Sequence, residues 1–339
     1  MLPSDCRDPT GSQRILRGVD DVDARRAWQG RRVSVVIVAP GQGSQTPGFL
    51  EPWLAEPRYA EHLVALSAAA GVDLAAHGTT SDADTIRDTA VAQPLIVGAS
   101  LLSLAALLER VDRTRLAGIA GHSVGELAAA AGAGILSEDD AMRLVAVRGR
   151  AMAAAAAEAE TGMSAVIGAD ADELAAKLEQ LGLSPANYNG GGQIVVAGAL
   201  PALAALKDAP PAGARVIPLQ VAGAFHTSYM GSAVDALREA AQGVEIADPA
   251  LPIWTNKDGA PITSGPIFVD LLVGQVASPV RWDLTMEAFA AAGVTGLVEL
   301  APAGALVGLA KRGLKGLPTV AVKTPADLDA AVELIGAAA

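Results

Sequence analysis

Apolar runs and glycine-rich turns alternate along the first half of the chain, a pattern typical of strands followed by helices. Residues 33–39 form a β-branched run that ends at a Pro-Gly turn, which predicts a buried strand. A second short strand is predicted at residues 117–120, with a tight turn at 121–125 and a helix from about Val124. Strands and helices alternate again after residue 245, so we expect an α/β core with a mostly parallel sheet.

Residues 163–221 have a different rhythm, with shorter segments in the order strand, helix, strand, strand, helix, strand. Asp170 or Asp172 and Leu200-Pro201 supply the helix starts. This βαββαβ order is that of the ferredoxin-like split unit. The expected domains are a disordered extension at residues 1–30, a discontinuous α/β core at 31–160 and 223–325, a ferredoxin-like subdomain at 161–222 and a C-terminal helix at 326–339.

The longest uncharged segment, residues 89–108, meets the length criterion for a membrane span. Gln93, Pro94 and Gly98 interrupt its apolar character, so a helix buried in a soluble core is the favoured interpretation. Residues 1–29 carry scattered charges and no apolar stretch, which argues against a secretory signal there. We therefore expect no membrane association.

Charge and cysteine content narrow the possible partners. The formal net charge is −12, and so acidic a chain lacks the broad basic surface that nucleic acid or an anionic membrane requires. The single cysteine, Cys6, cannot form an internal disulfide, and no Cys/His cluster predicts a metal site. We therefore expect no metal, no nucleic-acid partner and a reducing, cytoplasmic location.

The stretch AGHSVGE, residues 120–126, places Ser123 between two glycines. In a GxSxG turn the glycines allow a strained strand-to-helix connection that exposes the serine oxygen, while the helix N-terminus directs N–H groups at developing negative charge. The pattern alone fits a packing turn equally well. A nucleophilic role therefore requires a base elsewhere in the chain.

Four histidines could serve as that base: His62, His77, His122 and His226. His62 and His77 lie in a polar helical region and are expected to be exposed, and His122, next to the serine, should point elsewhere. His226 follows a loop that could return to the core, although a histidine at a helix start explains it as well. Because a long segment follows His226, the order Ser, acid, His of α/β-hydrolases is not met, and without a carboxylate a backbone carbonyl must orient the ring.

The helix predicted around residues 137–152 carries Arg148 on its apolar stripe, whereas Arg143 and Arg150 point away. A buried guanidinium needs an anion, either an internal carboxylate or the carboxylate of a substrate. The loop PGQGSQ after the first strand lacks the spacing of a phosphate-binding loop, but it could supply a second N–H group to an oxyanion.

Seven ordered motifs between residues 33 and 323 resemble those of the malonyl-CoA:acyl carrier protein malonyltransferases of fatty acid and polyketide synthesis, particularly the actinobacterial members. The motifs are APGQGSQTPGF, AVAQPLI, GHSVGE, VRGRAM, ANYNGGGQIVVAG, GAFHTSYM and LVGQVASPVRW. The resemblance implies an α/β-hydrolase-like large subdomain with an inserted ferredoxin-like one, and a site in the cleft between them. It implies no cofactor, since CoA and phosphopantetheine are substrate groups.

The resemblance also implies roles for individual residues. Ser123 would be acylated, His226 would act as its base, and Arg148 would pair with the malonyl carboxylate. The supporting groups would be the backbone N–H groups of Gln42 and Val124 for an oxyanion, the carbonyl of Gln275 for orienting the base, and the pocket residues Gln93, His122, Asn187, Asn189 and Phe225.

The implied reaction moves malonyl from malonyl-CoA to the phosphopantetheine thiol of an acyl carrier protein, the activity of an acyl-carrier-protein S-malonyltransferase. Phe225 ahead of His226 is the pattern of malonyl-selective relatives, because its bulk would fill the space of an α-methyl group. One methyl group contributes only about 1–3 kcal/mol of discrimination. The alternatives are a serine thioesterase or esterase that releases free acid, and an acyltransferase for another extender unit such as methylmalonyl.

A carrier protein is usually acidic, so docking on this acidic chain would need a local basic patch. The candidate residues are Arg281, Lys311, Arg312 and Lys315. Solvated surface charges without a partner are the alternative interpretation. We expect the protein to be a monomer.

Overall fold

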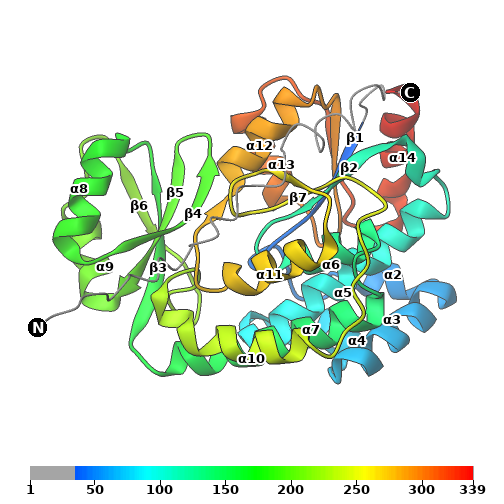
Figure 1. The fold of residues 1–339 in the computed structure, drawn as a ribbon, viewed down its shortest axis with the longest axis horizontal. Helices are drawn as coiled ribbons and strands as arrows, with labels where there is room; N and C mark the ends of the chain where they lie inside the picture. The colour runs from blue at the N-terminus through cyan, green and yellow to red at the C-terminus, as the bar shows by residue number, and fades with distance from the viewer. Residues whose placement is uncertain (1–34, 339) are drawn as a thin grey trace, which may run out of the picture. The chain divides into compact units, whose positions relative to one another are not determined.

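The computed structural model describes residues 35–338. The predicted extension at residues 1–30, Cys6 and Ala339 lie outside these residues. Within the described part, the larger sheet has the strand order β11-β10-β1-β2-β7-β8 and is parallel except for β8, which runs antiparallel to β7 (Figure 1). Its strands are β1 (Val35–Ala39), β2 (Leu116–Gly121), β7 (Ile253–Trp254), β8 (Pro261–Ile262), β10 (Gly296–Glu299) and β11 (Thr319–Ala321).

Strand β1 is buried on both faces, as its unbroken apolar run predicts. Alternate side chains enter different cores: Val35, Ile37 and Ala39 face one, and Val36 and Val38 face the other. The helices of the first core are α3 (Pro57–Ala70), α5 (Thr89–Leu108), α6 (Gly125–Ala133), α7 (Glu138–Ala157) and α14 (Leu328–Ala337), and those of the second are α12 (Trp282–Ala291) and α13 (Ala305–Gly313).

Helix α5 is the segment that raised the question of a membrane span. Among the described residues it is the one helix that is long and apolar enough to cross a membrane, but 83% of its apolar window is buried inside the protein. It packs against α6 and α7 and is therefore the core helix that the sequence predicts. The shorter helical elements are α2 (Glu51–Leu54), α4 (Leu74–Thr79), η1 (Thr85–Arg87), η2 (Arg113–Arg115), η3 (Ser228–Met230), α10 (Gly231–Ala241), α11 (Gly265–Gln275) and η4 (Pro325–Asp327).

The smaller sheet contains the βαββαβ unit. Its order is β6-β3-β5-β4-β9, and the first four strands are mutually antiparallel, as in a ferredoxin-like unit. The last, β9, comes from outside the unit and pairs in parallel with β4. The elements are β3 (Thr161–Ile167), α8 (Ala171–Leu181), β4 (Ser184–Gly190), β5 (Gln193–Ala199), α9 (Leu200–Asp208), β6 (Arg215–Pro218) and β9 (Val280–Arg281).

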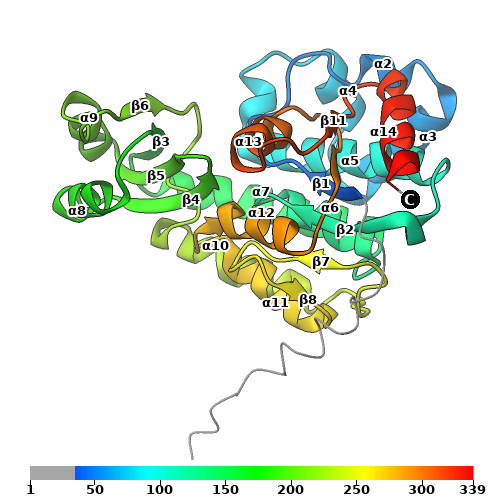
Figure 2. The same ribbon diagram turned by 90° about the horizontal axis from the view of Figure 1, so that it is seen from above.

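The two faces of the smaller sheet have different neighbours. Val166 and Val196 pack with α8 and α9 in a small separate core. Met163, Ala165 and Val195, on the opposite face, line a cavity shared with the large sheet. Figures 1 and 2 show the small sheet beside the large one rather than stacked on it.

These observations confirm the predicted fold class, a parallel α/β core with a ferredoxin-like unit. The boundaries proposed for the subdomains remain a prediction. One strand is shorter than expected: β6 ends at Pro218, whereas the sequence predicts a strand over residues 214–222. One backbone hydrogen bond to β3 follows Pro218, from Leu219 N to the Met163 carbonyl at 2.9 Å, and Leu219 and Val221 then line the cavity.

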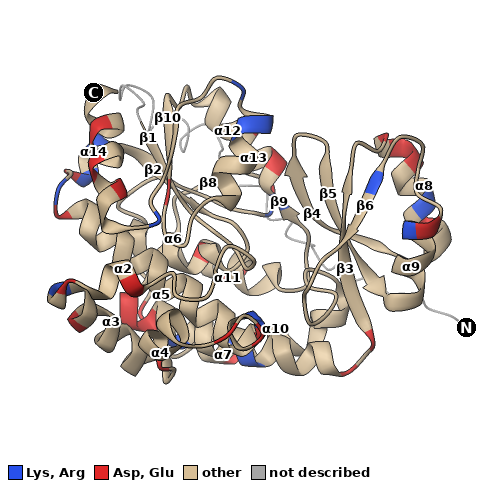
Figure 3. Ribbon diagram, turned by 180° about the vertical axis from the view of Figure 1, so that it is seen from behind, with Lys and Arg blue, Asp and Glu red and all other residues tan. Residues whose placement is uncertain are grey.

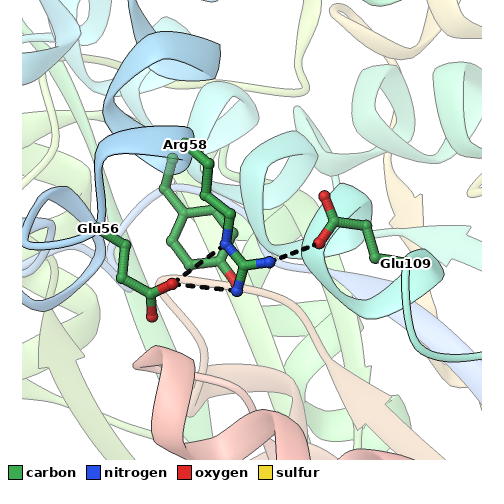
Figure 4. Close-up of polar contacts among 4 residues, drawn as sticks. Glu56, Arg58 and Glu109 are labelled. Atoms are coloured by element: carbon green, nitrogen blue, oxygen red, sulfur yellow. Dashed lines mark hydrogen bonds and ion pairs between the residues drawn. The ribbon is translucent and has the colours of Figure 1, made fainter.

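A charged cluster joins the start of α3 to the end of α5 at the surface. The Arg58 guanidinium contacts the carboxylates of Glu56 and Glu109, each at 3.0 Å, and lies 4.5 Å from the centre of the Tyr59 ring (Figure 4). Its partners are about half exposed, so water and salt screen the attraction. The cluster therefore fixes local geometry more than it stabilises the fold.

Glu299, fully buried at the end of β10, caps the start of α13. Its carboxylate accepts hydrogen bonds from the backbone N–H groups of Gly304 and Val307, both at 2.8 Å, and of Leu306 at 2.9 Å. The first N–H groups of a helix have no partner within the helix, so this carboxylate satisfies them in a region closed to water.

We expect Glu299→Gln to destabilise the protein by about 1–3 kcal/mol, because the amide NH₂ would face backbone N–H donors. Urea unfolding monitored by circular dichroism measures this. The matched control is Glu333→Gln on the exposed side of α14, which should change stability by less than about 0.5 kcal/mol. Equal unfolding midpoints for the two variants would contradict the capping role.

Candidate functional site

The turn from β2 into α6 brings backbone segments into very close contact. A Cβ atom on Gly121 would lie 2.0 Å from the carbonyl carbon of Gly125, and one on Gly125 would lie 2.2 Å from the carbonyl oxygen of Ala39. Only glycine fits at either position. Between them Ser123 has a φ of 54°, a left-handed conformation that is strained for serine. Its N–H donates to Asn256 Oδ1 at 2.7 Å, which holds the strained turn in place.

The serine hydroxyl points at a histidine. Ser123 Oγ lies 2.7 Å from His226 Nε2, and His226 Nδ1 lies 2.9 Å from the carbonyl oxygen of Gln275. A carbonyl can only accept, so Nδ1 carries the proton and Nε2 is free to accept one from the serine. Burial, and after it the positive charge of Arg148, lower the pKa of His226 to about 3. The ring is therefore a neutral base.

Arg148, from α7, completes this arrangement. Its guanidinium is almost fully buried and donates to Gln93 Oε1 at 2.7 Å and to Gln275 Oε1 at 2.9 Å, and one nitrogen lies 3.4 Å from Ser123 Oγ. Within residues 35–338 no carboxylate oxygen lies within 4.0 Å of it. The internal salt bridge that the sequence left open is therefore not formed. Neutral amides position the cation beside the serine, where it can receive an anion.

Ser123 and His226 line a cavity of about 470 Å³, and the buried Arg148 lies behind the serine, outside the cavity lining. The expected site residues on its polar wall are Gln42, Gln93, Asn187, Asn189 and His226. Its apolar wall is formed by residues of α7, α13 and the small sheet. Phe225 and Val124 also line it. Among the described residues, no group of three His, Cys, Asp or Glu side chains could hold a metal ion. The arrangement suits transfer of an acyl group through the serine.

Comparison with known proteins assigns this chain to a family. The chain matches the acyl transferase domain family over residues 36–332. The malonyl CoA-acyl carrier protein transacylase of Mycobacterium tuberculosis strain H37Rv is 52% identical over 299 residues, which cover 87% of this chain and 98% of that protein. The chain belongs to the malonyl CoA-acyl carrier protein transacylase family.

Solved structures of transacylases agree with this assignment. The crystal structure of MCAT from Mycobacterium tuberculosis has a TM-score of 0.84 at 51% identity and covers 89% of this chain and 99% of that chain. A structure of a type II PKS acyl-carrier protein in complex with its malonyl-transacylase matches with a TM-score of 0.83 at 32% identity, covering 89% of this chain and 99% of the other. The fold and the order of elements are thus those of the transacylases.

Two other residues expected at the site, His122 and Asn189, contact each other through their side chains. His122 Nε2 lies 3.0 Å from Asn189 Oδ1, and Asn189 Nδ2 donates to Gln193 at 2.9 Å. The His122 ring also packs edge-on against Trp282, at 5.5 Å between ring centres. These contacts direct His122 away from Ser123, as its place on the turn predicts.

The remaining histidines differ from expectation. His62 is only partly exposed and bonds Glu138 at 2.7 Å, a contact that raises its pKa above the usual value. His77 is also partly buried and contacts Ser81 at 3.0 Å. The expectation that both are exposed is wrong, because amphipathic helices pack their flanking polar residues against neighbouring elements.

Sequence reasoning missed two residues that hold the site together. Asn256 is fully buried; besides accepting from Ser123 N, it donates from Nδ2 to the Gly121 carbonyl at 2.7 Å. Glu126 is buried in the first turn of α6, where one oxygen accepts from Asn256 N at 2.6 Å. A polar residue at the end of a buried strand and one carboxylate in an otherwise apolar, alanine-rich helix are the signals that could have identified them.

The expected docking residues divide into two groups. Lys311 and Arg312 at the end of α13, and Lys315 just after it, are exposed, and Arg312 also lines the cavity. Figure 3 colours the Lys and Arg positions of the ribbon blue and the Asp and Glu positions red. Arg281 is instead paired with Asp283 through two hydrogen bonds of 2.8 and 2.9 Å and lies over the Tyr188 ring. Arg281 is therefore paired internally, whereas the other three of these four candidates remain exposed.

The low pKa of His226 predicts how serine reactivity depends on pH. Because the ring stays neutral down to about pH 3, we expect the rate of Ser123 modification by a fluorophosphonate probe to lack a titration near the ordinary histidine pKa of about 6.5. Intact-protein mass spectrometry between pH 5 and 8 follows the adduct, with Ser123→Ala as the blank. A rate that falls tenfold per pH unit below 6.5 would show that the base is not held in this buried, neutral state.

Proposed function

We propose that this protein transfers malonyl from malonyl-CoA to the phosphopantetheine thiol of an acyl carrier protein. The observation that carries the proposal is the 2.7 Å contact between Ser123 Oγ and His226 Nε2 with the unpaired cation of Arg148 beside it. A nucleophile and its base on a cavity wall, with a buried cation 3.4 Å from the nucleophile, match the chemistry that the relatives' names state.

The first half of the reaction acylates the serine. His226 Nε2 takes the proton of Ser123 Oγ as the oxygen attacks the thioester carbonyl carbon. The N–H groups of Gln42 and Val124, both on the cavity wall, would stabilise the oxyanion. The carbon–sulfur bond then breaks, and His226 returns its proton to the CoA sulfur, leaving malonyl on the serine and free CoA thiol.

The second half reverses these steps with the carrier thiol. His226 takes the thiol proton as the sulfur attacks the malonyl ester, and it returns that proton to Ser123 Oγ when the ester bond breaks. Arg148 binds the malonyl carboxylate with two N–H groups throughout. The Gln275 carbonyl accepts from His226 Nδ1 and so keeps the ring oriented toward the serine. The buried pocket beside Phe225 favours malonyl over a branched extender.

Other functions are less well supported. A thioesterase must admit water to the acylated serine, and an orienting carboxylate is replaced here by the Gln275 carbonyl. Methylmalonyl remains the alternative extender. We further propose that the protein works as a monomer in the cytoplasm, without a cofactor, and supplies either fatty acid or polyketide synthesis.

Intact-protein mass after brief incubation with malonyl-CoA tests the transfer. We expect a malonyl adduct on the parent and none on Ser123→Ala, since the serine oxygen is the acceptor. Adding an acyl carrier protein bearing phosphopantetheine should move the adduct to the carrier. Loss of the adduct to water, with the carrier unmodified, would favour the thioesterase instead.

Carrier docking is proposed for the exposed cations of α13. We expect the double variant Lys311→Glu, Arg312→Glu to slow transfer to the carrier about tenfold at low salt, because charge steers association. Self-acylation by malonyl-CoA, measured on the same samples, separates docking from chemistry. The matched control is Lys177→Glu, Lys207→Glu on the helices of the small subdomain. Equal slowing by both double variants would remove the α13 patch from the proposal.

A further inference from the structure

Glu126 is the buried carboxyl group nearest in sequence to the nucleophile, and the proposed mechanism does not use it. Its two oxygens have different partners. Oε1 accepts from the N–H of Asn256 at 2.6 Å, and Oε2 accepts from the side-chain amide of Gln275. The first contact leads to the Ser123 N–H through Asn256 Oδ1. The second leads to the Gln275 amide, whose Nε2 also lies 3.2 Å from the Ser123 carbonyl and from Asn256 Oδ1.

The second contact leads to Arg148. Gln275 Nε2 faces Glu126, so Gln275 Oε1 faces the opposite side and accepts from the Arg148 guanidinium at 2.9 Å. Arginine has only donors and an ionised carboxylate only acceptors, so each end of the amide has one allowed partner when Glu126 is ionised. If the amide were reversed, its NH₂ would face the guanidinium, donor against donor.

Glu126 is also the carboxyl group whose charge reaches Arg148. Burial raises the pKa of Glu126 to about 8, while the hydrogen bond from Asn256 N and the positive charge of Arg148 act in the opposite direction. Burial likewise lowers the pKa of Arg148 to about 10, and the negative charge of Glu126 opposes that change. The electrostatic attraction between the two groups thus favours the charged form of each, in opposition to burial.

We propose that Glu126 is a positioning residue that sets the preference for acyl groups bearing a carboxylate, by fixing the Gln275 amide so that its oxygen holds Arg148 in place. The proposal rests on the proposed function, in which Arg148 binds the malonyl carboxylate. A residue that only supported the serine turn would affect every acyl group equally. Glu126 instead acts on the arginine that a carboxylated acyl group needs and an acetyl group does not.

The test compares acylation by malonyl-CoA and acetyl-CoA in the full-length Glu126→Gln variant. A glutamine that keeps its Oε1 for the Asn256 N–H places its NH₂ against Gln275 Nε2, so the variant disturbs the amide that holds Arg148 and keeps the contact with Asn256 N. We expect kcat/KM for malonyl-CoA to fall about 10- to 100-fold, mainly through KM, the range for loss of a hydrogen bond to a charged group. Acetyl-CoA acylation should fall less than about threefold.

Two further variants separate positioning from folding. Glu126→Asp keeps two acceptor oxygens and should retain the malonyl-to-acetyl ratio within about threefold. Gln275→Met removes the acceptor for Arg148 but leaves the backbone carbonyl for His226. The ratio of kcat/KM for malonyl-CoA to that for acetyl-CoA should therefore fall in this variant as it does in Glu126→Gln. Adding Glu126→Gln to Gln275→Met should lower the ratio no further, because both changes remove one interaction.

Several results would overturn the proposal. These are an equal loss for both thioesters in folded Glu126→Gln, an unchanged ratio, or additive effects in the double variant. If Glu126→Gln does not fold by circular dichroism, a reduced ratio in Glu126→Asp or an unchanged one in Gln275→Met overturns it. A parent enzyme that is not acylated by malonyl-CoA would refute the proposed function itself, and that measurement comes first.

Discussion

The close approach of three backbone segments at the serine turn is the constraint on which the site depends. The Ala39 carbonyl, Gly121 and Gly125 meet with no room for a side chain, which ties the end of β1 to the end of β2 and the start of α6. Parallel neighbouring strands end at the same edge of a sheet, so the loops after β1, β2 and β7 converge there. Ser123, Gln42 and Asn256 reach one place because of this packing.

Burial lowers the pKa of both His226 and Arg148 at this site. His226 is kept neutral because its surroundings are closed to water and contain a cation, so it can accept a proton across the physiological range. The same burial would make Arg148 costly without partners, and amide oxygens of Gln93 and Gln275 supply them. Neutral acceptors hold a guanidinium without neutralising it, which leaves its charge available to a substrate anion.

Much of the architecture could be predicted because it follows from local patterns. The β-branched run of β1 and the βαββαβ order of the small unit can be predicted from the sequence, because the spacing and length of their apolar segments distinguish strands from helices. The sequence predicts a strand after residue 245, where β7 lies, but not that β7 is only two residues long or that β6 ends early, because both depend on pairing partners distant in sequence. The motif pattern located Ser123 and Arg148, but Asn256 and Glu126 act through contacts more than 120 residues apart along the chain.

Asn256 and Gln275 connect the parts of the site, because each makes contacts through both its backbone and its side chain. Asn256 accepts from Ser123 N through its side chain, and its carbonyl accepts from Arg281 N at 2.8 Å, where β9 joins the small sheet. Gln275 orients His226 through its carbonyl and Arg148 through its amide. A shift of the small sheet would therefore be transmitted to the serine turn through β9 and Asn256. Precise placement of the nucleophile and selection of the acyl group thus depend on the same buried polar network, because few water molecules can compete for its donors and acceptors.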